Sequence, residues 1–141
     1  MTILKLLGIL MHTIKIKVRG YHLDMYRHVN NARFLEFLEE ARWNFVEAKL
    51  DLQDWFKKGL GFAVVNINIH YRKPALLNQI LNIKSEMSQI STKSATIKQD
   101  IFINSTDILI ADAKVTFVIV DIKTGRAIPL EGEIRKILKS L

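Results

Sequence analysis

The sequence of 141 residues contains no cysteine. This absence excludes a disulfide framework, a thiol nucleophile and a thiolate metal site, and it fits a reducing compartment. The chain also has no run of five or more basic residues, although its net charge is +7. Because the basic residues are scattered, we expect no nucleic-acid binding, and the excess charge favours other anionic partners, such as a phosphorylated small molecule.

A long apolar run is missing as well. The apolar N-terminus, Met-Thr-Ile-Leu-Lys-Leu-Leu-Gly-Ile-Leu-Met, is too short to span a bilayer, and no small-residue cleavage site follows it. Strand-like alternation begins directly after Met11, so we interpret residues 1–11 as an N-terminal extension with Met11 as an alternative start. Residues 1–10 are expected to be dispensable or loosely ordered. No repeat, low-complexity segment or linker divides residues 12–141, which predicts a single domain.

Hydrophobic spacing in the first half of the chain predicts one strand and one long helix. Residues 12–19 alternate apolar and basic side chains, which indicates a strand with one buried face. Apolar side chains then recur at three- and four-residue spacing through residues 30–48, which predicts an amphipathic helix with Asn30 as its N-cap. Shorter helices are expected at residues 52–58 and after Pro129.

The second half of the chain is rich in strands. Four long strands are predicted, at residues 62–71, 80–90, 95–104 and 108–121. We expect them to form a meander, with a bulge or bend at residues 72–75 because Pro74 cannot donate to a strand ladder. Together with the first strand they make a mainly antiparallel five-stranded sheet, and the long helix must cover one of its faces. The fold class is therefore predicted to be α+β.

The most informative segment joins the first strand to the long helix. It carries Asp24, His28, Asn30 and Asn31 directly before or at the helix start. A carboxylate, an imidazole and a helix N-terminus are parts that chemistry at a polarised carbonyl requires, since they supply an acid or base and fixed N–H donors. Each residue also has a purely structural interpretation, in which Asp24 forms a turn, His28 bonds to backbone and the asparagines cap the helix.

The run at residues 24–34, Asp-Met-Tyr-Arg-His-Val-Asn-Asn-Ala-Arg-Phe, resembles the signature of hotdog-fold thioesterases. It is most similar to the 4-hydroxybenzoyl-CoA thioesterase-like and acyl-ACP thioesterase branches. A second match lies at residues 71–75, Tyr-Arg-Lys-Pro-Ala, and the element order agrees over residues 12–121. The resemblance implies a hotdog fold, in which a five-stranded sheet wraps a long central helix. It also implies hydrolysis of an acyl thioester by a homodimer or tetramer with the acyl tunnel at the subunit interface.

The resemblance assigns roles to individual residues. Asp24 matches the catalytic carboxylate, which acts as nucleophile or as general base for water, and the Asn31 backbone N–H matches the donor that polarises the thioester carbonyl. His28 matches a histidine that orients water or the carboxylate. Glu39 matches an acidic helix position, which we interpret as a support for the loop. Tyr26 stands where the acyl-ACP branch usually has asparagine, and we expect it to line the acyl pocket instead.

Three further residues are candidates for substrate binding. Asn30 lies at the helix start, while Arg72 and Lys73 are either solvated charges beside a bend or contacts for the phosphates of coenzyme A. The sequence thus predicts a cytoplasmic thioesterase that hydrolyses a fatty or aromatic acyl-CoA to free acid and CoA, with no metal or other cofactor. The alternatives left open are an acyl-ACP thioesterase, a non-catalytic module that binds acyl-CoA or acyl carrier protein, and a hotdog dehydratase.

Overall fold

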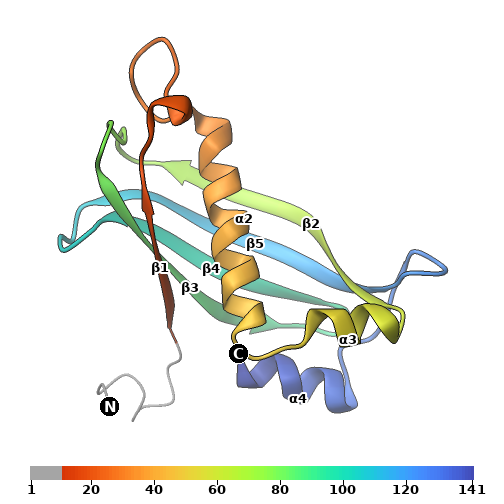
Figure 1. The fold of residues 1–141 in the computed structure, drawn as a ribbon. Coiled ribbons are helices and arrows are strands. Elements are labelled where there is room, and N and C mark those ends of the chain that lie inside the picture. Colours follow the sequence, from red (N-terminus) through yellow and green to blue (C-terminus); the bar gives the residue numbers. More distant parts are fainter. Residues whose placement is uncertain (1–10) are drawn as a thin grey trace.

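The computed structural model describes residues 11–141, and the expectations for residues 1–10 lie outside the described part. The elements are β1 (His12–Lys17), the short 3-10 helix η1 (Gly20–His22), α2 (Asn31–Glu47), α3 (Leu52–Lys57), β2 (Leu60–Tyr71), β3 (Ile80–Ile90), β4 (Ser94–Ile103), β5 (Leu109–Asp121), β6 (Arg126–Ala127) and α4 (Gly132–Ser140). The predicted α+β class, the long helix and the five long strands are confirmed, each close to its expected ends. Figure 1 shows the five long strands curling around α2, as the hotdog resemblance implies.

The strands of the sheet follow the order β1-β3-β4-β5-β2, with the short β6 beside β5. Every described pair of strands is antiparallel. The predicted meander holds for β3, β4 and β5, but it was wrong for β2, which pairs with β5 and forms an edge of the sheet. The connection at residues 72–79 carries the chain from this edge to β3. A connection between distant strands has no local sequence signal, so spacing alone did not reveal it.

The end of β2 bends as Pro74 predicted. The N–H groups of Arg72 and Lys73 both donate to the Ile110 carbonyl, at 2.8 and 3.1 Å. Two donors on one acceptor break the regular ladder, so β2 ends at Tyr71 and the chain turns toward β3.

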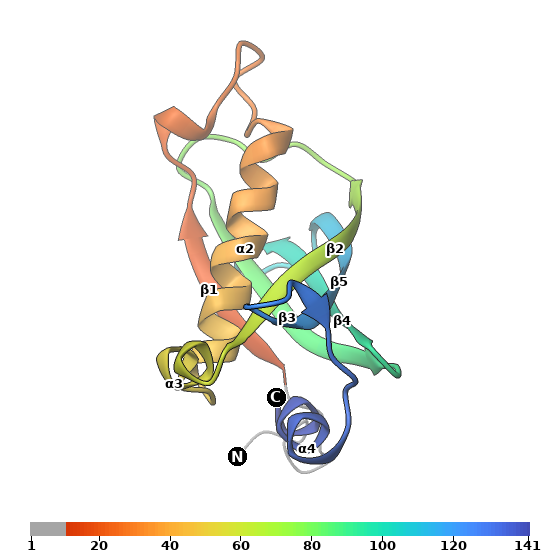
Figure 2. The same ribbon diagram turned by 90° about the vertical axis from the view of Figure 1, so that its right-hand side faces the viewer.

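Helix α2 lies across one face of the sheet (Figures 1 and 2). Its buried side chains follow the predicted stripe, and all are at most 7% exposed: Phe34, Phe37, Leu38, Ala41, Phe45 and Val46. Burial of each large apolar side chain contributes roughly 1.5–3 kcal/mol. The helix packs mainly on β1 and β3, and Figure 1 shows β2 running away from the lower half of α2 toward the right.

Candidate active site

Residues 24–28 form a tight hairpin loop beside the N-terminal end of α2 (Figure 1). The Asp24 carbonyl accepts from the Arg27 N–H at 2.9 Å, and the Asp24 N–H donates to the His28 carbonyl at 3.0 Å. Arg27 adopts a φ of 61°, so the loop is a turn followed by a left-handed residue, as in bulged hairpins. The loop therefore holds the backbones of Asp24 and His28 opposite each other.

The Asp24 carboxylate takes part in this turn. Its Oδ1 accepts from the Tyr26 N–H at 3.0 Å, which is the usual role of an aspartate that opens a turn. Among residues 11–141 its Oδ2 has no hydrogen-bond partner, and the residue is half-buried. The structural and catalytic interpretations of Asp24 are thus compatible, because the turn engages one oxygen and leaves the other available.

The other side chains of the loop are exposed. Tyr26 is 70% exposed and Met25 is 85% exposed, so Tyr26 does not line a pocket formed by residues 11–141. The His28 ring is also exposed and makes no hydrogen bond to any described residue. The structure brings His28 to the backbone of Asp24, but it leaves both His28 and Tyr26 facing solvent.

The start of α2 is held by the side chains of Asn30 and Tyr71. Asn30 Oδ1 accepts from the Ala32 N–H at 2.9 Å, which confirms Asn30 as the N-cap. The Asn30 N–H donates to the His22 carbonyl at 2.9 Å. Tyr71 Oη donates to the Asn31 carbonyl at 3.1 Å, a contact that sequence reasoning missed although Tyr71 begins the second matching motif.

The Asn31 N–H is left without an acceptor in the part of the chain that the structure describes. N–H groups in the first turn of a helix point outward along its axis, and the helix dipole adds positive potential there. Since Asn30 and Tyr71 fix the first turn, this N–H has a fixed direction and is oriented to donate to an acceptor outside residues 11–141.

His22 attaches the base of the loop to α2. Its side chain is 7% exposed, and its Nδ1 accepts from the Arg19 N–H at 2.9 Å. The ring meets Phe37 of α2 edge-on, with centroids 4.8 Å apart. Burial lowers the pKa of His22, and the positive charges of Arg33 and Arg19 act in the same direction. The His22 side chain is therefore a neutral imidazole at the base of the loop. In the sequence, only its position two residues before Asp24 pointed to this role.

The two predicted phosphate contacts, Arg72 and Lys73, have different environments. Arg72 Nε lies 2.7 Å from Asp112 Oδ2 in an ion pair at the surface. Hydrogen bonding from Arg72 lowers the pKa of Asp112. Lys73 is exposed and has no ion-pair partner within residues 11–141. The structure therefore leaves the Lys73 ammonium more available to an anionic ligand than the Arg72 guanidinium.

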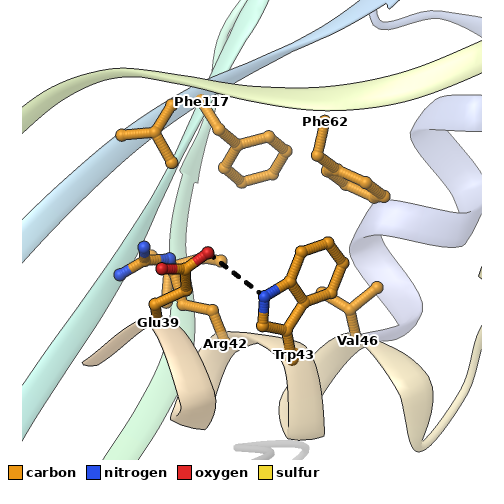
Figure 3. A pocket seen from close by; sticks show the side chains of 8 residues that line it. Glu39, Arg42, Trp43, Val46, Phe62 and Phe117 are labelled. Carbon is orange, nitrogen blue, oxygen red and sulfur yellow. Dashed lines mark hydrogen bonds between the residues drawn. The ribbon is translucent and has the colours of Figure 1, made fainter. Parts of the chain in front are cut away.

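A pocket of about 300 Å³ lies between the lower half of α2 and the β2–β5 edge of the sheet (Figure 3). Its lining residues come from four elements: Glu39, Arg42, Trp43, Val46, Phe62, Val64, Ile97 and Phe117. Trp43 Nε1 donates to Glu39 Oε1 at 3.3 Å. Glu39 thus belongs to the pocket wall, and it makes no hydrogen bond to the loop that it was expected to support.

Arg42 joins this pocket to a buried polar network. Its Nη1 donates to Gln99 Oε1 at 3.1 Å. The Gln99 Nε2 donates to the Leu38 carbonyl at 3.0 Å and to Ser85 Oγ at 2.9 Å. Burial lowers the pKa of Arg42, while the Glu39 carboxylate opposes that shift. Sequence reasoning missed this network because its members come from α2, β3 and β4, far apart in the chain.

Residues 11–141 contain no group of three histidine, aspartate or glutamate side chains placed to hold a metal ion. None of the helices described in that range is long and apolar enough to cross a membrane.

Comparison with known proteins identifies relatives of this chain. The family model of the thioesterase-like superfamily matches residues 18–138. The long-chain acyl-CoA thioesterase FadM of Escherichia coli is 50% identical over 127 residues, which cover 90% of this chain and 96% of that protein. A crystal structure of the probable thioesterase YbaW from Escherichia coli superimposes with a TM-score of 0.86 at 49% identity, covering 91% of this chain and 96% of the other. The 1,4-dihydroxy-2-naphthoyl-CoA thioesterase Slr0204 from Synechocystis, at 20% identity, shares the fold with a TM-score of 0.81 over 93% of this chain and 97% of its own.

Proposed function

This chain belongs to the thioesterase-like superfamily, and on that premise we propose that it hydrolyses long-chain acyl-CoA to free fatty acid and CoA. The substrate named for the Escherichia coli relative FadM supports this choice. The observation in the structure that carries the proposal is the Asn31 N–H at the start of α2, which has no acceptor among residues 11–141 and lies beside the loop that presents Asp24.

The Asn31 N–H supplies electrostatic stabilisation. As a nucleophile adds to the thioester carbonyl, negative charge develops on the carbonyl oxygen, and a fixed donor at a helix N-terminus meets that charge without rearrangement. Removal of one such donor typically lowers the rate by roughly 10²–10³-fold. The Asn30 cap and the Tyr71 hydrogen bond keep the donor in place.

The Asp24 carboxylate supplies the nucleophilic or basic function. As a general base, it takes a proton from water while the water oxygen adds to the carbonyl carbon, the C–S bond breaks, and the departing thiolate takes up a proton. As a nucleophile, it adds to the carbonyl carbon, the C–S bond breaks, the CoA thiolate leaves and takes up a proton, and the resulting anhydride is hydrolysed by water to free acid and the Asp24 carboxylate. Both routes end in free acid and CoA, and His28, across the hairpin from Asp24, orients the water or the carboxylate.

The substrate's nucleotide end carries phosphates, which we assign to Lys73 with a smaller contribution from the paired Arg72.

We further propose that residues 12–141 form a single hotdog domain, which works as a homodimer or tetramer in the cytoplasm. Strand β2 is an edge strand of the described sheet, and pairing with a second copy would cover that edge. The cysteine-free composition fits the reducing cytoplasm.

The test is release of free thiol from an acyl-CoA panel that runs from butyryl-CoA to stearoyl-CoA. The wild type is expected to hydrolyse long-chain members, and Asp24→Asn should lower the rate by roughly 10³-fold. Asp107→Asn, at an exposed acid away from the loop, is the matched control and should leave the rate unchanged.

Other outcomes would contradict the proposal in distinct ways. Near wild-type hydrolysis by Asp24→Asn would refute the role of that carboxylate. Acyl-CoA binding without thiol release would indicate a binding module, and hydrolysis confined to acyl carrier protein substrates would indicate an acyl-ACP thioesterase.

A further inference from the structure

Large apolar side chains are exposed at the end of the molecule that carries the candidate active site. They belong to η1, the hairpin at residues 23–29 and the connection that leads into β3, and Figures 1 and 2 show these segments at the end opposite α3 and α4. Contiguous exposed apolar groups of this kind mark interaction sites. The side chains are between 42% and 85% exposed, and we call them the loop patch: Tyr21, Met25, Tyr26, Leu76, Leu77 and Ile80.

Backbone hydrogen bonds hold the segments of the loop patch next to one another. The Val29 N–H donates to the Ala75 carbonyl at 2.9 Å, which joins the hairpin to the connection before β3. The Asn78 N–H donates to the Val18 carbonyl at 3.0 Å, and the Val18 N–H donates to the Gln79 carbonyl at 2.9 Å, so the same connection is tied to the chain that enters η1. The apolar side chains therefore stand on one connected framework.

Basic side chains border the loop patch on the β1 side. Lys15, Lys17 and Arg19 are exposed and occupy every second position, so they lie on one face of this extended segment. Lys17 is the direct cross-strand neighbour of Ile80, a member of the patch. This row of cations therefore begins at the edge of the apolar surface.

Positive charge exceeds negative charge around the patch. Arg27 adds a fourth exposed cation within the hairpin itself. Among residues 11–141 none of the four takes part in an ion pair. The nearby carboxylates are Asp24, which is half-buried in its turn, and Asp107, in the turn whose Asn104 N–H donates to the Ile80 carbonyl. The surface thus combines apolar groups with a positive border.

These features match a lipid bilayer better than a second copy of the chain. The apolar groups stand on projecting loops, tyrosine rings favour the boundary between water and lipid, and lysine and arginine are attracted to anionic headgroups. A copy paired along the β2 edge would lie at the opposite side of the sheet from β1 and β3. It would therefore leave Leu76, Leu77 and Ile80 uncovered.

We propose that the loop patch docks this protein on the surface of a bilayer that carries anionic headgroups. The apolar side chains enter the interfacial region, and the four cations contact lipid phosphates. The docking itself goes beyond the proposed function, because it requires no hydrolysis, and its consequence rests on that function. The Asn31 N–H lies beside the hairpin, so docking would bring the candidate site close to long-chain acyl-CoA that has partitioned into the bilayer.

The first test is co-sedimentation of the full chain with vesicles. Wild type is expected to bind vesicles of phosphatidylglycerol and phosphatidylcholine in equal parts more tightly than vesicles of phosphatidylcholine alone, and less tightly as salt is added. The double variant Leu76→Asn with Leu77→Asn should lower the partition coefficient by roughly tenfold or more. The matched control is Phe56→Asn with Ile122→Asn, at exposed apolar positions of the other end, and it should bind as wild type does.

The second test removes two charges from the border of the patch. Each basic side chain near an anionic surface typically changes the partition coefficient by roughly fivefold. Lys15→Gln with Lys17→Gln should therefore weaken binding to phosphatidylglycerol vesicles by roughly tenfold or more. Lys57→Gln with Lys123→Gln makes the same change in net charge at exposed positions of the other end and should have little effect. Equal effects of the two charge variants would overturn the proposed orientation.

Hydrolysis assays separate failure of the docking proposal from failure of the proposed function. All four double variants should hydrolyse soluble octanoyl-CoA as wild type does, while Leu76→Asn with Leu77→Asn should hydrolyse vesicle-bound palmitoyl-CoA more slowly. Wild type that ignores anionic vesicles, or unchanged binding by this variant, would overturn the docking proposal alone. Self-association lost in this variant, without vesicle binding, would overturn it and assign the patch to a second copy. Vesicle binding through the patch without any hydrolysis would overturn the thioesterase proposal alone.

Discussion

The two halves of helix α2 present different chemistry. Its N-terminal end has a polar hairpin, and the Asn31 N–H and one Asp24 carboxylate oxygen there have no hydrogen-bond partner in the described part of the chain. Along its C-terminal half the neighbouring groups are aromatic rings and Val46, and the charged groups there are paired with other protein groups. One helix thus carries a region suited to bond breaking and a region suited to recognition of an apolar chain.

The two regions also depend on different forces. The N-terminal end is built from hydrogen bonds through Asn30, Tyr71 and His22, each with a net contribution of about 1 kcal/mol. The pocket is built from aromatic packing that belongs to the core. Changes at the N-terminal end should therefore affect every substrate alike, whereas changes at the pocket should depend on chain length.

The largest effect on stability is expected where the two halves of α2 are joined. Gln99 is fully buried beneath α2 and bonds Leu38, Arg42 and Ser85. Gln99→Leu would remove these three hydrogen bonds from buried polar groups, so the free energy of unfolding should fall by roughly 3 kcal/mol. Urea denaturation would measure this loss. Gln89→Leu, at an exposed position of β3, is the control, and an equally small effect of both changes would show that the network contributes little.

A smaller effect is expected at Lys73, the residue proposed to contact the phosphates of CoA. Lys73→Ala should raise KM by roughly threefold to tenfold, equivalent to about 1 kcal/mol at an exposed site, because a phosphate contact is lost. The factor should be the same for octanoyl-CoA and palmitoyl-CoA and should shrink as salt is added. Steady-state kinetics at two ionic strengths would test this, and a chain-length-dependent factor would contradict the assignment of Lys73 to the nucleotide end.

The smallest effect is expected from the protonation of His22. Its pKa is lowered in the folded state by burial, so below about pH 6.5 the unfolded chain binds a proton that the folded chain does not. Stability should therefore fall as the pH drops from 7.5 to 5.5, in wild type more than in His22→Gln. Thermal melts across this range would show the difference. His70→Gln, at an exposed histidine, is the control and should show the same dependence of stability on pH as the wild type. If all three proteins show the same dependence, protonation of His22 does not contribute to stability.

The local structure at the N-terminal end of α2 could be predicted from the sequence because that segment is contiguous. Asp24, His28, Asn30 and Asn31 lie within eight positions, and a helix cap is a local structure that residue types report directly. The turn made by the Asp24 side chain was also among the interpretations that the sequence offered. The placement of β2 could not be predicted, because strand pairing across residues 72–79 depends on packing of the whole sheet.

The pocket could not be predicted for the same reason. Its lining comes from α2, β2, β4 and β5, and only the fold brings these elements together. Glu39 illustrates the difference between what the sequence shows of a residue and what only the fold shows. Its acidic character and helical position were evident from the sequence, but its neighbours were not, and the structure places it against Trp43 rather than beside the loop.

The central claim is that the Asn31 backbone N–H stabilises the oxyanion, and proline tests it most directly. Proline at the first helical position removes only the N–H and is well tolerated there, and Asn30 already has the extended backbone, with φ −60° and ψ 138°, that precedes proline. The measurement is kcat for palmitoyl-CoA and octanoyl-CoA in Asn31→Pro and Asn31→Ala, with melting temperatures to verify folding. We expect Asn31→Ala to retain most activity and Asn31→Pro to lose roughly 10²–10³-fold on both substrates. A folded Asn31→Pro enzyme with the activity of Asn31→Ala would contradict the claim.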